Sequence, residues 1–450
     1  GGLIMYIKLT KKIKFSAVQI LALGFSMVIL LGAIILSLPI SSKSGEFTPF
    51  LDSLFTSTSA VCVTGLITLN TAAHWNYFGK TVIIILIQIG GLGFMSFTTL
   101  FALMVKKKIT LRERLLIQEA MNTFGIQGLV RMIRYILAFT FSVEMLGALL
   151  LSTQFIPKFG FLKGIYYSIW HSISAFCNAG FDLFGDNLVG YANNKTVILT
   201  IAALIVIGGL GFTVWSELYN YKGYKKLSLH SKVVIMITAI LLIGGAILMF
   251  IFEYNNPNTL KYMSFGDKLT NAFFASATTR TAGFNSVSTA DMTLAGKFLT
   301  ILLMFVGGSP GSTAGGIKTA TFGIVVLTLI SIIRGREDTE VFKKRISKEL
   351  VYKAFAVLFI GFGIVVLGTL ILAVTEPGFS LEYILYEVTS AFATVGLTLG
   401  LTPYLSVIGK IIIIITMYLG RVGPMTVVLA LANRKKPSAY KYPEDKILIG

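Results

Sequence analysis

Four short segments of this chain share one pattern, in which a glycine is followed by a bulky apolar residue. Each segment follows a short amphipathic stretch and lies between two long apolar segments. The four segments are Val63-Thr64-Gly65-Leu66, Asn178-Ala179-Gly180-Phe181, Thr281-Ala282-Gly283-Phe284 and Thr394-Val395-Gly396-Leu397. Glycine lets a backbone approach closely and adopt φ values that other residues resist. Four copies of helix, re-entrant loop and helix can therefore ring one axis with backbone carbonyls, as an ion pore requires.

The repeat holds position by position when residues are counted back from each of these glycines. Aromatic residues stand ten positions upstream: Phe55, Trp170, Phe273 and Tyr386. Small residues stand six and five positions upstream: Ser59, Ser174, Ala277 and Ser390, then Ala60, Ala175, Thr278 and Ala391. A large residue that wedges a helix and small ones that let it pack closely predict a pore helix. Glycine is frequent in membrane helices, but four copies in register at several positions indicate a true internal repeat.

Composition places these repeats in a membrane. Only 13% of the residues are charged, against about 25% in a soluble domain, and several apolar runs are near the length of a transmembrane helix. We predict eight spans, at about 16–40, 80–105, 135–155, 196–219, 233–253, 297–333, 352–375 and 406–432. The predicted fold is an all-α polytopic membrane protein, with four tandem helix–pore loop–helix repeats and eight transmembrane spans around a pseudo-fourfold pore.

The predicted spans divide the chain into two tails and four repeats. The boundaries are 1–15 for a cytoplasmic N-terminal tail, 16–105 for repeat 1, 106–219 for repeat 2, 220–333 for repeat 3, 334–432 for repeat 4 and 433–450 for a cytoplasmic C-terminal tail. No cleavable leader is expected, because the first apolar run is long and lacks a convincing cleavage site.

The formal net charge of +19 does not indicate nucleic-acid binding, because the basic residues are distributed by topology. Most of the 39 lysines and arginines fall in the two tails and in the connectors 106–134, 222–232 and 334–353. The positive-inside rule then places both termini in the cytoplasm and all four glycine-centred loops at the outer face of the cell membrane. The remaining basic excess suits anionic membrane lipids or an acidic partner.

The four segments themselves lack Asp and Glu, which disfavours a calcium or sodium channel with a carboxylate ring. Main-chain oxygens instead suit a large monovalent cation. The predicted selectivity filter consists of Val63, Thr64, Gly65, Asn178, Ala179, Gly180, Thr281, Ala282, Gly283, Thr394, Val395 and Gly396. Because the four segments differ, only a few carbonyl layers near the glycines are expected to be well formed. Cys62 and Cys177 are expected to pack behind the filter, and the three histidines form no ligand cluster.

A second glycine-containing run follows each filter glycine by 24 to 28 residues. The runs begin at Gly90, Gly208, Gly307 and Gly420. The third is longer and more polar, and it interrupts the predicted span 297–333. It is not a phosphate-binding loop, because Ile317 separates its last glycine from Lys318 and no strand precedes it.

Unwound polar backbone at membrane depth is tolerated where it is buried in protein or lines a cavity. We therefore predict that the third run forms an intramembrane gate below the filter, with a simple helix break as the alternative. The gate residues are Gly307, Gly308, Ser309, Pro310, Gly311, Ser312, Thr313, Ala314, Gly315, Gly316, Lys318 and Arg421.

Three basic residues lie close to these segments in the sequence. Arg421 directly follows Gly420, and a charged residue within a span is costly and is a functional candidate by default. We predict that Arg421 donates hydrogen bonds to carbonyls of the gate and braces it. Lys318, which is counted with the gate, is expected near the cytoplasmic end of its span. Arg280, three residues before Gly283, is expected behind the third filter loop, bonded to a pore-helix carbonyl or to an acidic neighbour.

These glycine-centred loops and the broken third-repeat span resemble the Trk/Ktr/HKT superfamily of potassium transporters. The resemblance covers nearly the whole chain, and the short N-terminal tail and eight spans are most similar to the membrane subunit of the bacterial Ktr systems. In that family, glycine at all four filter positions accompanies potassium, and serine at the first accompanies a sodium preference. Glycine stands at all four positions here, at Gly65, Gly180, Gly283 and Gly396. The resemblance therefore implies K⁺ as the substrate and a gating loop in the third repeat.

Control is expected to come from another chain. No predicted span carries Arg or Lys at every third residue, which excludes a voltage sensor, and no segment outside the spans reaches the roughly 50 residues of a domain. The resemblance implies a homodimer with one pore per subunit and a cytosolic RCK-type ring of the KtrA kind. That ring, rather than this chain, would bind the nucleotide. No covalent cofactor is expected, and activation by Na⁺ is left open.

Three alternatives stand beside potassium uptake. The first is a sodium-conducting or poorly selective monovalent cation transporter of the same superfamily. The second is an alternating-access secondary carrier, which predicts two inverted halves and a midplane site; four repeats in the same direction disfavour it. The third is an intramembrane enzyme, which requires clustered nucleophiles, carboxylates or metal ligands that the sequence does not display.

Overall fold

The computed structural model describes residues 17–93, 129–221 and 227–423. Within these residues the same order of elements occurs four times: a long helix, a short helix, a glycine-centred loop and a further helix. We call each occurrence a unit. Both predicted tails and most of the connector 106–134 lie outside the described residues.

The helices have the following bounds. Unit 1 contains α1 (Ala17–Ser37), η1 (Pro39–Ser41), α2 (Phe50–Val61), α3 (Thr71–His74) and α4 (Tyr77–Leu92). Unit 2 contains α7 (Leu129–Phe159), α8 (Phe161–Phe176), η2 (Val189–Tyr191), α9 (Lys195–Gly209) and α10 (Phe212–Tyr219). Unit 3 contains α11 (Leu229–Glu253), α12 (Phe265–Thr278), α13 (Leu294–Phe305) and α14 (Thr319–Ile333). Unit 4 contains α15 (Lys348–Thr375), α16 (Leu381–Ala393), η4 (Thr402–Tyr404) and α17 (Val407–Val422).

Four of the described helices are long and apolar enough to cross a membrane, namely α1, α7, α11 and α15. The bent pair α9–α10 makes a fifth if it counts as one span, and α4, α13 and α14 are shorter apolar helices. The chain is therefore a largely helical membrane protein. The predicted spans 80–105 and 406–432 run into residues outside the described part.

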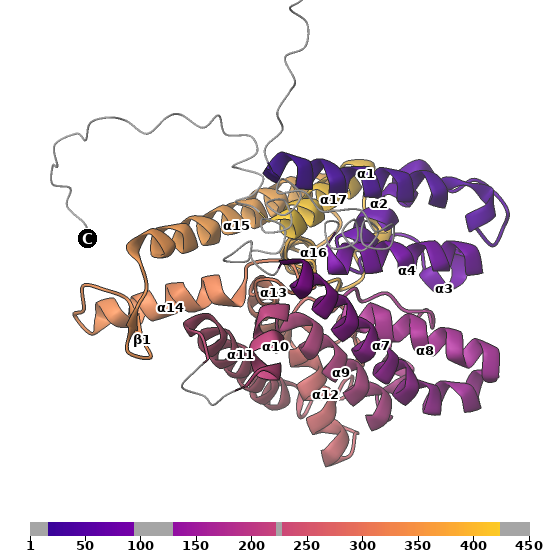
Figure 1. Ribbon diagram of the computed structural model, residues 1–450. Helices are drawn as coiled ribbons and strands as arrows, with labels where there is room; N and C mark the ends of the chain where they lie inside the picture. Colours follow the sequence, from indigo (N-terminus) through magenta and orange to yellow (C-terminus); the bar gives the residue numbers. More distant parts are fainter. Residues whose placement is uncertain (1–16, 94–128, 222–226, 424–450) are drawn as a thin grey trace, which may run out of the picture.

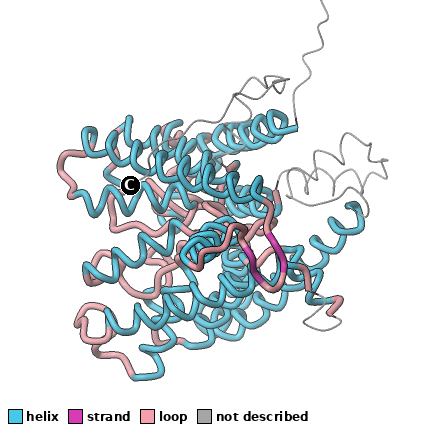
Figure 2. Tube along the Cα trace, turned by 90° about the vertical axis from the view of Figure 1, so that its left-hand side faces the viewer, coloured by secondary structure: helices cyan, strands magenta, loops and turns pink. Residues whose placement is uncertain are grey.

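Two details of the predicted fold are wrong. The segment 196–219 is not one helix, because α9 and α10 meet at an angle of 96°. The break falls at Gly211, whose φ of 100° an ordinary side chain resists. The connector 334–353 also holds a two-stranded antiparallel ribbon, β1 (Glu340–Val341) and β2 (Lys344–Arg345). Figure 2 shows it in magenta among the cyan helices.

Each helix that follows a glycine-centred loop begins at a residue with a short polar side chain. Asn76, Asn194, Thr293 and Ser406 precede α4, α9, α13 and α17. Every one of these side chains accepts a hydrogen bond from the backbone N–H three residues further on. Such caps satisfy N–H groups that a helix leaves without a partner, and each contributes about 1 kcal/mol. The helix that follows the glycine-centred loop therefore begins with the same kind of cap in all four units.

The four units pack in a closed ring. Each short helix packs against the long helix of its own unit, in the pairs α1–α2, α7–α8, α11–α12 and α15–α16. Between units, α4 packs on α8, α9 on α12, α13 on α16 and α17 on α2. Units 1 to 4 therefore follow one another around a common axis, and unit 4 returns to unit 1. In Figure 1 the indigo helix α1 lies beside the yellow helix α17.

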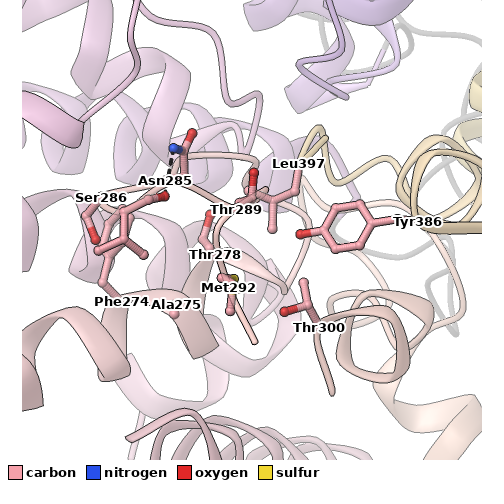
Figure 3. A pocket seen from close by; sticks show the side chains of 11 residues that line it. Phe274, Ala275, Thr278, Asn285, Ser286, Thr289, Met292, Thr300, Tyr386 and Leu397 are labelled. Carbon is pink, nitrogen blue, oxygen red and sulfur yellow. Dashed lines mark hydrogen bonds between the residues drawn. The ribbon is translucent and has the colours of Figure 1, made fainter. Parts of the chain in front are cut away.

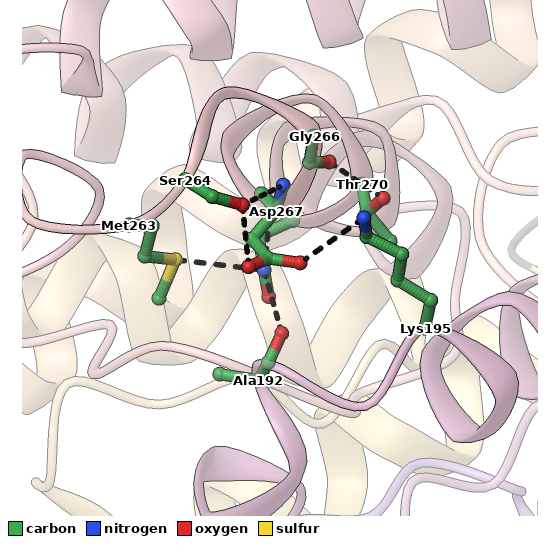
Figure 4. A network of polar contacts seen from close by, with 8 residues as sticks. Ala192, Lys195, Met263, Ser264, Gly266, Asp267 and Thr270 are labelled. Atoms are coloured by element: carbon green, nitrogen blue, oxygen red, sulfur yellow. Dashed lines mark hydrogen bonds and ion pairs between the residues drawn. The ribbon is translucent and has the colours of Figure 1, made fainter.

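Polar contacts join neighbouring units at the edge of the ring. Between units 4 and 1, Lys410 Nζ lies 2.6 Å from Asp52 Oδ1, and Tyr418 Oη donates to the Ala22 carbonyl at 2.7 Å. Between units 2 and 3, the ammonium of Lys195 lies 3.7 Å from Asp267 Oδ1 (Figure 4). Neighbouring units are thus held together by specific polar groups as well as by apolar packing.

Candidate functional site

The four glycine-centred loops meet at the axis of the ring. A β-carbon added at Gly65 would collide with the carbonyl oxygen of Ala179 in the next unit. The same relation links Gly180 to Ala282, Gly283 to Val395 and Gly396 to Thr64, all by carbonyl oxygens. The contacts close the circle in the order of the chain. Each glycine is therefore required by a neighbouring loop, and larger residues at these positions would push the loops apart.

The sign of the backbone angle φ alternates in the same way in each loop. The residue two positions before each glycine has positive φ, 54° at Val63, 58° at Asn178, 71° at Thr281 and 52° at Thr394. The glycines themselves have φ of 98°, 69°, 75° and 93° in chain order, while φ of the residue between is not positive. Positive φ is uncommon outside glycine and is unusual for β-branched residues. A repeated strain of this kind at one site indicates function rather than accident.

Hydrogen bonds from the short helices support the strained backbone. The amide nitrogens of Thr64, Ala179 and Val395 donate to the carbonyls of Ser59, Ser174 and Ser390, each at 2.8 Å. In unit 3 the amide of Ala282 donates to the Thr278 carbonyl at 2.9 Å. The last carbonyls of each short helix, which lack partners inside the helix, thereby hold the start of the loop.

The small residues five and six positions upstream do more than permit close packing. Ser59 and Ser390 accept hydrogen bonds from the amides of Gly65 and Gly396, both at 3.0 Å. Ser174 Oγ donates to the Phe181 carbonyl at 2.8 Å. Unit 3 has alanine at the sixth position, and Thr278 Oγ1 makes the corresponding bond to the Phe284 carbonyl at 2.6 Å. Sequence reasoning missed these roles, although three serines at one repeat position were a visible signal.

The second glycine runs fix the helices behind the loops. In units 1, 2 and 4, a β-carbon on Gly90, Gly208 or Gly420 would collide with a carbonyl oxygen at the end of the short helix. These oxygens belong to Val61, Phe176 and Phe392, each four residues before its loop glycine. The predicted packing residue Cys177 is buried and free, and its Sγ lies where a β-carbon on Gly91 would go.

Unit 3 departs from this arrangement. Gly307 faces the carbonyl oxygen of Gly315, within the same loop, instead of the end of α12. The loop from Val306 to Lys318 turns back on itself, since Val306 and Ile317 form a parallel bridge and the Gly307 amide donates to the Ile317 carbonyl at 2.8 Å. The loop is largely buried, with the side chains of Ser309 and Thr313 fully so.

This loop is bonded to units 2 and 4 and lies against the start of two glycine-centred loops. The amides of Ser309 and Thr313 donate to the carbonyls of Gly209 and Gly208, at 3.0 and 3.3 Å. The amide of Gly316 donates to the Gly420 carbonyl at 3.3 Å. A β-carbon on Gly315 would meet the side chain of Thr394, and one on Gly307 would lie 3.2 Å from Thr281 Cγ2. The predicted gate and the predicted filter are thus in direct contact.

The guanidinium of Arg421 joins the loop to unit 1. It donates to the carbonyl oxygen of Thr313 through one nitrogen, and to the carbonyls of Gly90 and Gly91 through the other, the Gly91 contact at 3.3 Å. One side chain therefore contacts the glycine-rich backbone of two other units. Arginine suits this position because its planar head carries several donors in a fixed geometry.

The two other basic residues have different partners. Lys318 Nζ donates to the Ala314 carbonyl at 2.5 Å, so it bonds within the loop. The expectation for Arg280 is wrong: its guanidinium donates to the Gly307 carbonyl at 3.4 Å, and within the described part of the chain it has no hydrogen bond to a short-helix carbonyl or to an acid. Arg280 thus lies at the entry of the loop, where its buried guanidinium bonds to the Gly307 carbonyl.

A small cavity of about 20 Å³ lies between units 3 and 4, beside these loops. Tyr386 from α16 and Thr300 from α13 line it, together with Thr278 and Asn285 (Figure 3). Its volume admits one water molecule. Among the described residues, no group of three or more His, Cys, Asp or Glu is placed to hold a metal ion. The site thus consists of backbone oxygens, hydroxyls and a few basic side chains.

The four loops thus form a closed ring of strained backbone within apolar helices. The chain belongs to the TrkH family of cation transport proteins, whose model matches residues 13–441. It is 48% identical to the potassium/sodium uptake protein NtpJ of Enterococcus hirae, over 97% of this chain and 98% of that protein. It is 42% identical to the Ktr system potassium uptake protein B of Bacillus subtilis, over 98% of this chain and 99% of that protein.

A solved structure shares the fold. The potassium transporter TrkH of Vibrio parahaemolyticus superposes with a TM-score of 0.71 at 19% sequence identity, over 94% of this chain and 86% of that chain. The matched proteins are ion transporters, so the family is not one of enzymes.

Proposed function

We propose that this chain carries potassium into the cell through a selectivity filter formed by the four glycine-centred loops. The observation that supports this most is the closed contact between each loop glycine and a carbonyl-bearing residue of the next loop. Alternating φ signs turn successive carbonyls to the same side of a backbone, so that they can replace the water around a large monovalent cation. The full-length relatives named for potassium uptake favour K⁺ as that cation.

The proposed architecture has eight transmembrane spans, with both termini in the cytoplasm and the filter at the outer face. In this arrangement α2, α8, α12 and α16 are pore helices. The loop from Val306 to Lys318 is the gate, because it is buried directly against Thr281 and Thr394, the first residues of two filter segments. Arg421 braces the gate in the position that obstructs the pore.

The chain is further proposed to act as a homodimer under a cytosolic RCK-type ring. The relatives named as Ktr system components support association with other subunits. The nucleotide would be bound by that ring, and activation by Na⁺ would act on the assembled complex. The ribbon β1–β2 and its basic flanks, with Arg345 and Lys344, are candidate contacts for an acidic surface of the ring.

A second candidate is conduction of sodium as well as potassium. The name of the Enterococcus hirae relative, a potassium/sodium uptake protein at 48% identity, favours it. The four filter segments are unequal in sequence, which permits looser selectivity than four identical loops would give.

The test is rubidium-86 uptake into proteoliposomes that hold only this chain, with K⁺ or Na⁺ as the competitor. Uptake that K⁺ blocks and Na⁺ does not supports potassium uptake. Equal competition favours the sodium-conducting candidate. Absence of uptake both alone and with a cytosolic ring subunit added contradicts the proposal.

A further inference from the structure

The residue nine positions before each filter glycine differs in every unit. Thr56, His171, Phe274 and Glu387 occupy this position, and all four side chains are completely buried. They lie on equivalent faces of α2, α8, α12 and α16. The equivalent position in the four short helices therefore holds four different side chains, two of which are ionisable.

In unit 4 the carboxylate of Glu387 is tied to the chain that follows the filter. Thr398 Oγ1 donates to Glu387 Oε2 at 2.6 Å, and Thr402 Oγ1 donates to the other oxygen. Thr398 stands two residues after Gly396. Its carbonyl in turn accepts from Thr289 Oγ1 of unit 3 at 2.6 Å. Among the ion pairs of the described residues, none includes Glu387.

In unit 2 the imidazole of His171 makes the corresponding tie. Its Nδ1 lies 2.7 Å from the Tyr167 carbonyl, which can only accept, so Nδ1 carries the proton. Nε2 then accepts from the backbone amide of Leu183 at 3.2 Å. Leu183 stands three residues after Gly180. The ring stacks on Phe184 with centroids 4.3 Å apart, which fixes its orientation.

Units 1 and 3 lack such a tie at this position. Thr56 Oγ1 donates to the Asp52 carbonyl at 2.9 Å, inside its own helix. Phe274 has no polar atom in its side chain. The two tied units, 2 and 4, are not adjacent in the order of the ring, so they face each other across the axis.

We propose that His171 and Glu387 are positioning residues that hold the outer ends of two opposite filter loops and thereby set selectivity among monovalent cations. This inference rests on the proposed potassium-uptake function. Discrimination by carbonyls depends on their number and on how firmly they keep their places. In unit 4 the tie runs from α16 to the hydroxyls of Thr398 and Thr402, two and six residues beyond the filter glycine. In unit 2 it runs from α8 to the backbone amide of Leu183, three residues beyond the filter glycine.

The test uses rubidium-86 uptake in proteoliposomes, with the ratio of K⁺ to Na⁺ inhibition as the readout. Thr402→Val removes one hydrogen-bond donor to Glu387 with nearly unchanged side-chain shape. Thr402→Ser keeps a hydroxyl at this position. His171→Phe removes the acceptor and keeps a flat ring in its aromatic surroundings. Thr56→Val is the matched control: it makes the same threonine-to-valine change, at the repeat position that His171 and Glu387 occupy in their units, where the Thr56 hydroxyl donates within its own helix.

We expect Thr402→Val and His171→Phe each to lower the K⁺ to Na⁺ ratio roughly three- to tenfold, the net contribution of one ordinary hydrogen bond. Thr402→Ser and Thr56→Val should match the unmodified chain. Variants are compared only as monodisperse protein with measurable rubidium uptake, which separates selectivity from failed folding.

Ratios in Thr402→Val and His171→Phe equal to that of the unmodified chain would overturn the inference. An equal loss in Thr56→Val would overturn it as well, since selectivity would then depend on any change in the pore helices. Failure of the proposed function itself is distinguished by the unmodified chain, which in that case would show no preference for K⁺.

Discussion

Two pieces of irregular backbone lie against each other inside the helices, and they are built in opposite ways. Each glycine-centred loop is held by its own short helix and by an equivalent loop on either side. The loop from Val306 to Lys318 occurs in one unit, and its partners are unlike one another: glycine carbonyls of two units and the guanidinium of Arg421. Because the same contacts recur in all four units, the ring of glycine-centred loops is held by more contacts than it needs. The second depends on a few separate bonds, and its proposed role as a gate requires it to change position while the ring stays intact.

The largest effect is expected from shortening the unrepeated loop. Deleting Gly311 to Gly315 removes Thr313, which donates to unit 2 and accepts from Arg421 of unit 4. Basal rubidium uptake should rise roughly tenfold, as a barrier lower by about 1.4 kcal/mol would allow, because the obstruction is gone while the ring keeps its own supports. Unaltered or lower uptake in folded protein would mean that the loop is only a structural helix break.

A side chain added to the ring of filter loops should change cation selectivity more than total uptake. Gly65→Ser places atoms against the carbonyl oxygen of Ala179, and φ of 98° resists the new residue. We expect the preference for K⁺ over Na⁺ to fall by roughly tenfold in the competition assay, about 1.4 kcal/mol, with total uptake less affected. Gly363→Ser is the control, because a β-carbon there meets nothing within 4 Å. An unchanged preference in Gly65→Ser would contradict the filter assignment.

Loss of the arginine brace should have a smaller effect on the same loop. Arg421→Gln removes the charge and all but one or two donors, while the loop keeps its backbone hydrogen bonds to units 2 and 4. Basal uptake should increase roughly threefold to tenfold, with selectivity retained. Arg421→Lys keeps the charge without the fork of donors and should give an intermediate value. A loss of selectivity in place of higher uptake would show that Arg421 supports the ring instead.

The smallest effect is expected from removing one of the serine hydroxyls that support the filter loops. Ser390→Ala removes the acceptor for the Gly396 amide, which costs about 1 kcal/mol of stability and should lower the melting temperature in detergent by a few degrees. Ala277→Ser adds a hydroxyl at the equivalent position of unit 3, where Thr278 already makes the bond. It should leave the melting temperature unchanged. Equal shifts in both variants would contradict the assignment of these hydroxyls as supports.

The sequence predicts the repeated parts of this molecule well. Glycines, aromatic residues and small residues recur in register because every unit must satisfy the same local contacts, and the long polar run in repeat 3 is visible as an exception. The contacts of Arg421 with Thr313 and Gly90 join residues far apart in sequence. Its place beside a glycine run pointed to carbonyl partners but not to which ones.

The missed features have a common physical reason. The bend at Gly211 is stabilised from outside its own unit, because the Phe212 amide donates to the Gly311 carbonyl at 2.9 Å. Arg280 bonds to Gly307 rather than to its neighbours in sequence. Hydropathy and spacing report which face of a helix is buried, but not which distant group it meets. The polar ties of His171 and Glu387 were hidden for the same reason, since their partners lie beyond the filter.

The seam between α17 and the first two helices has a consequence for the synthesis of the protein. Asp52 meets its partner Lys410 only after another 358 residues have been added, and Ala22 waits still longer for Tyr418. Translation at 5 to 20 residues per second leaves the first unit with one open side for roughly 20 to 70 seconds. During this time the half-buried carboxylate of Asp52 lacks Lys410, and the strained loop of unit 1 can gain its neighbour in unit 2 but not the one in unit 4. A nascent chain of this protein therefore remains an unclosed arc in the bilayer until its last helix arrives, and chains that stop early present that open side to lipid, to insertion factors and to membrane proteases.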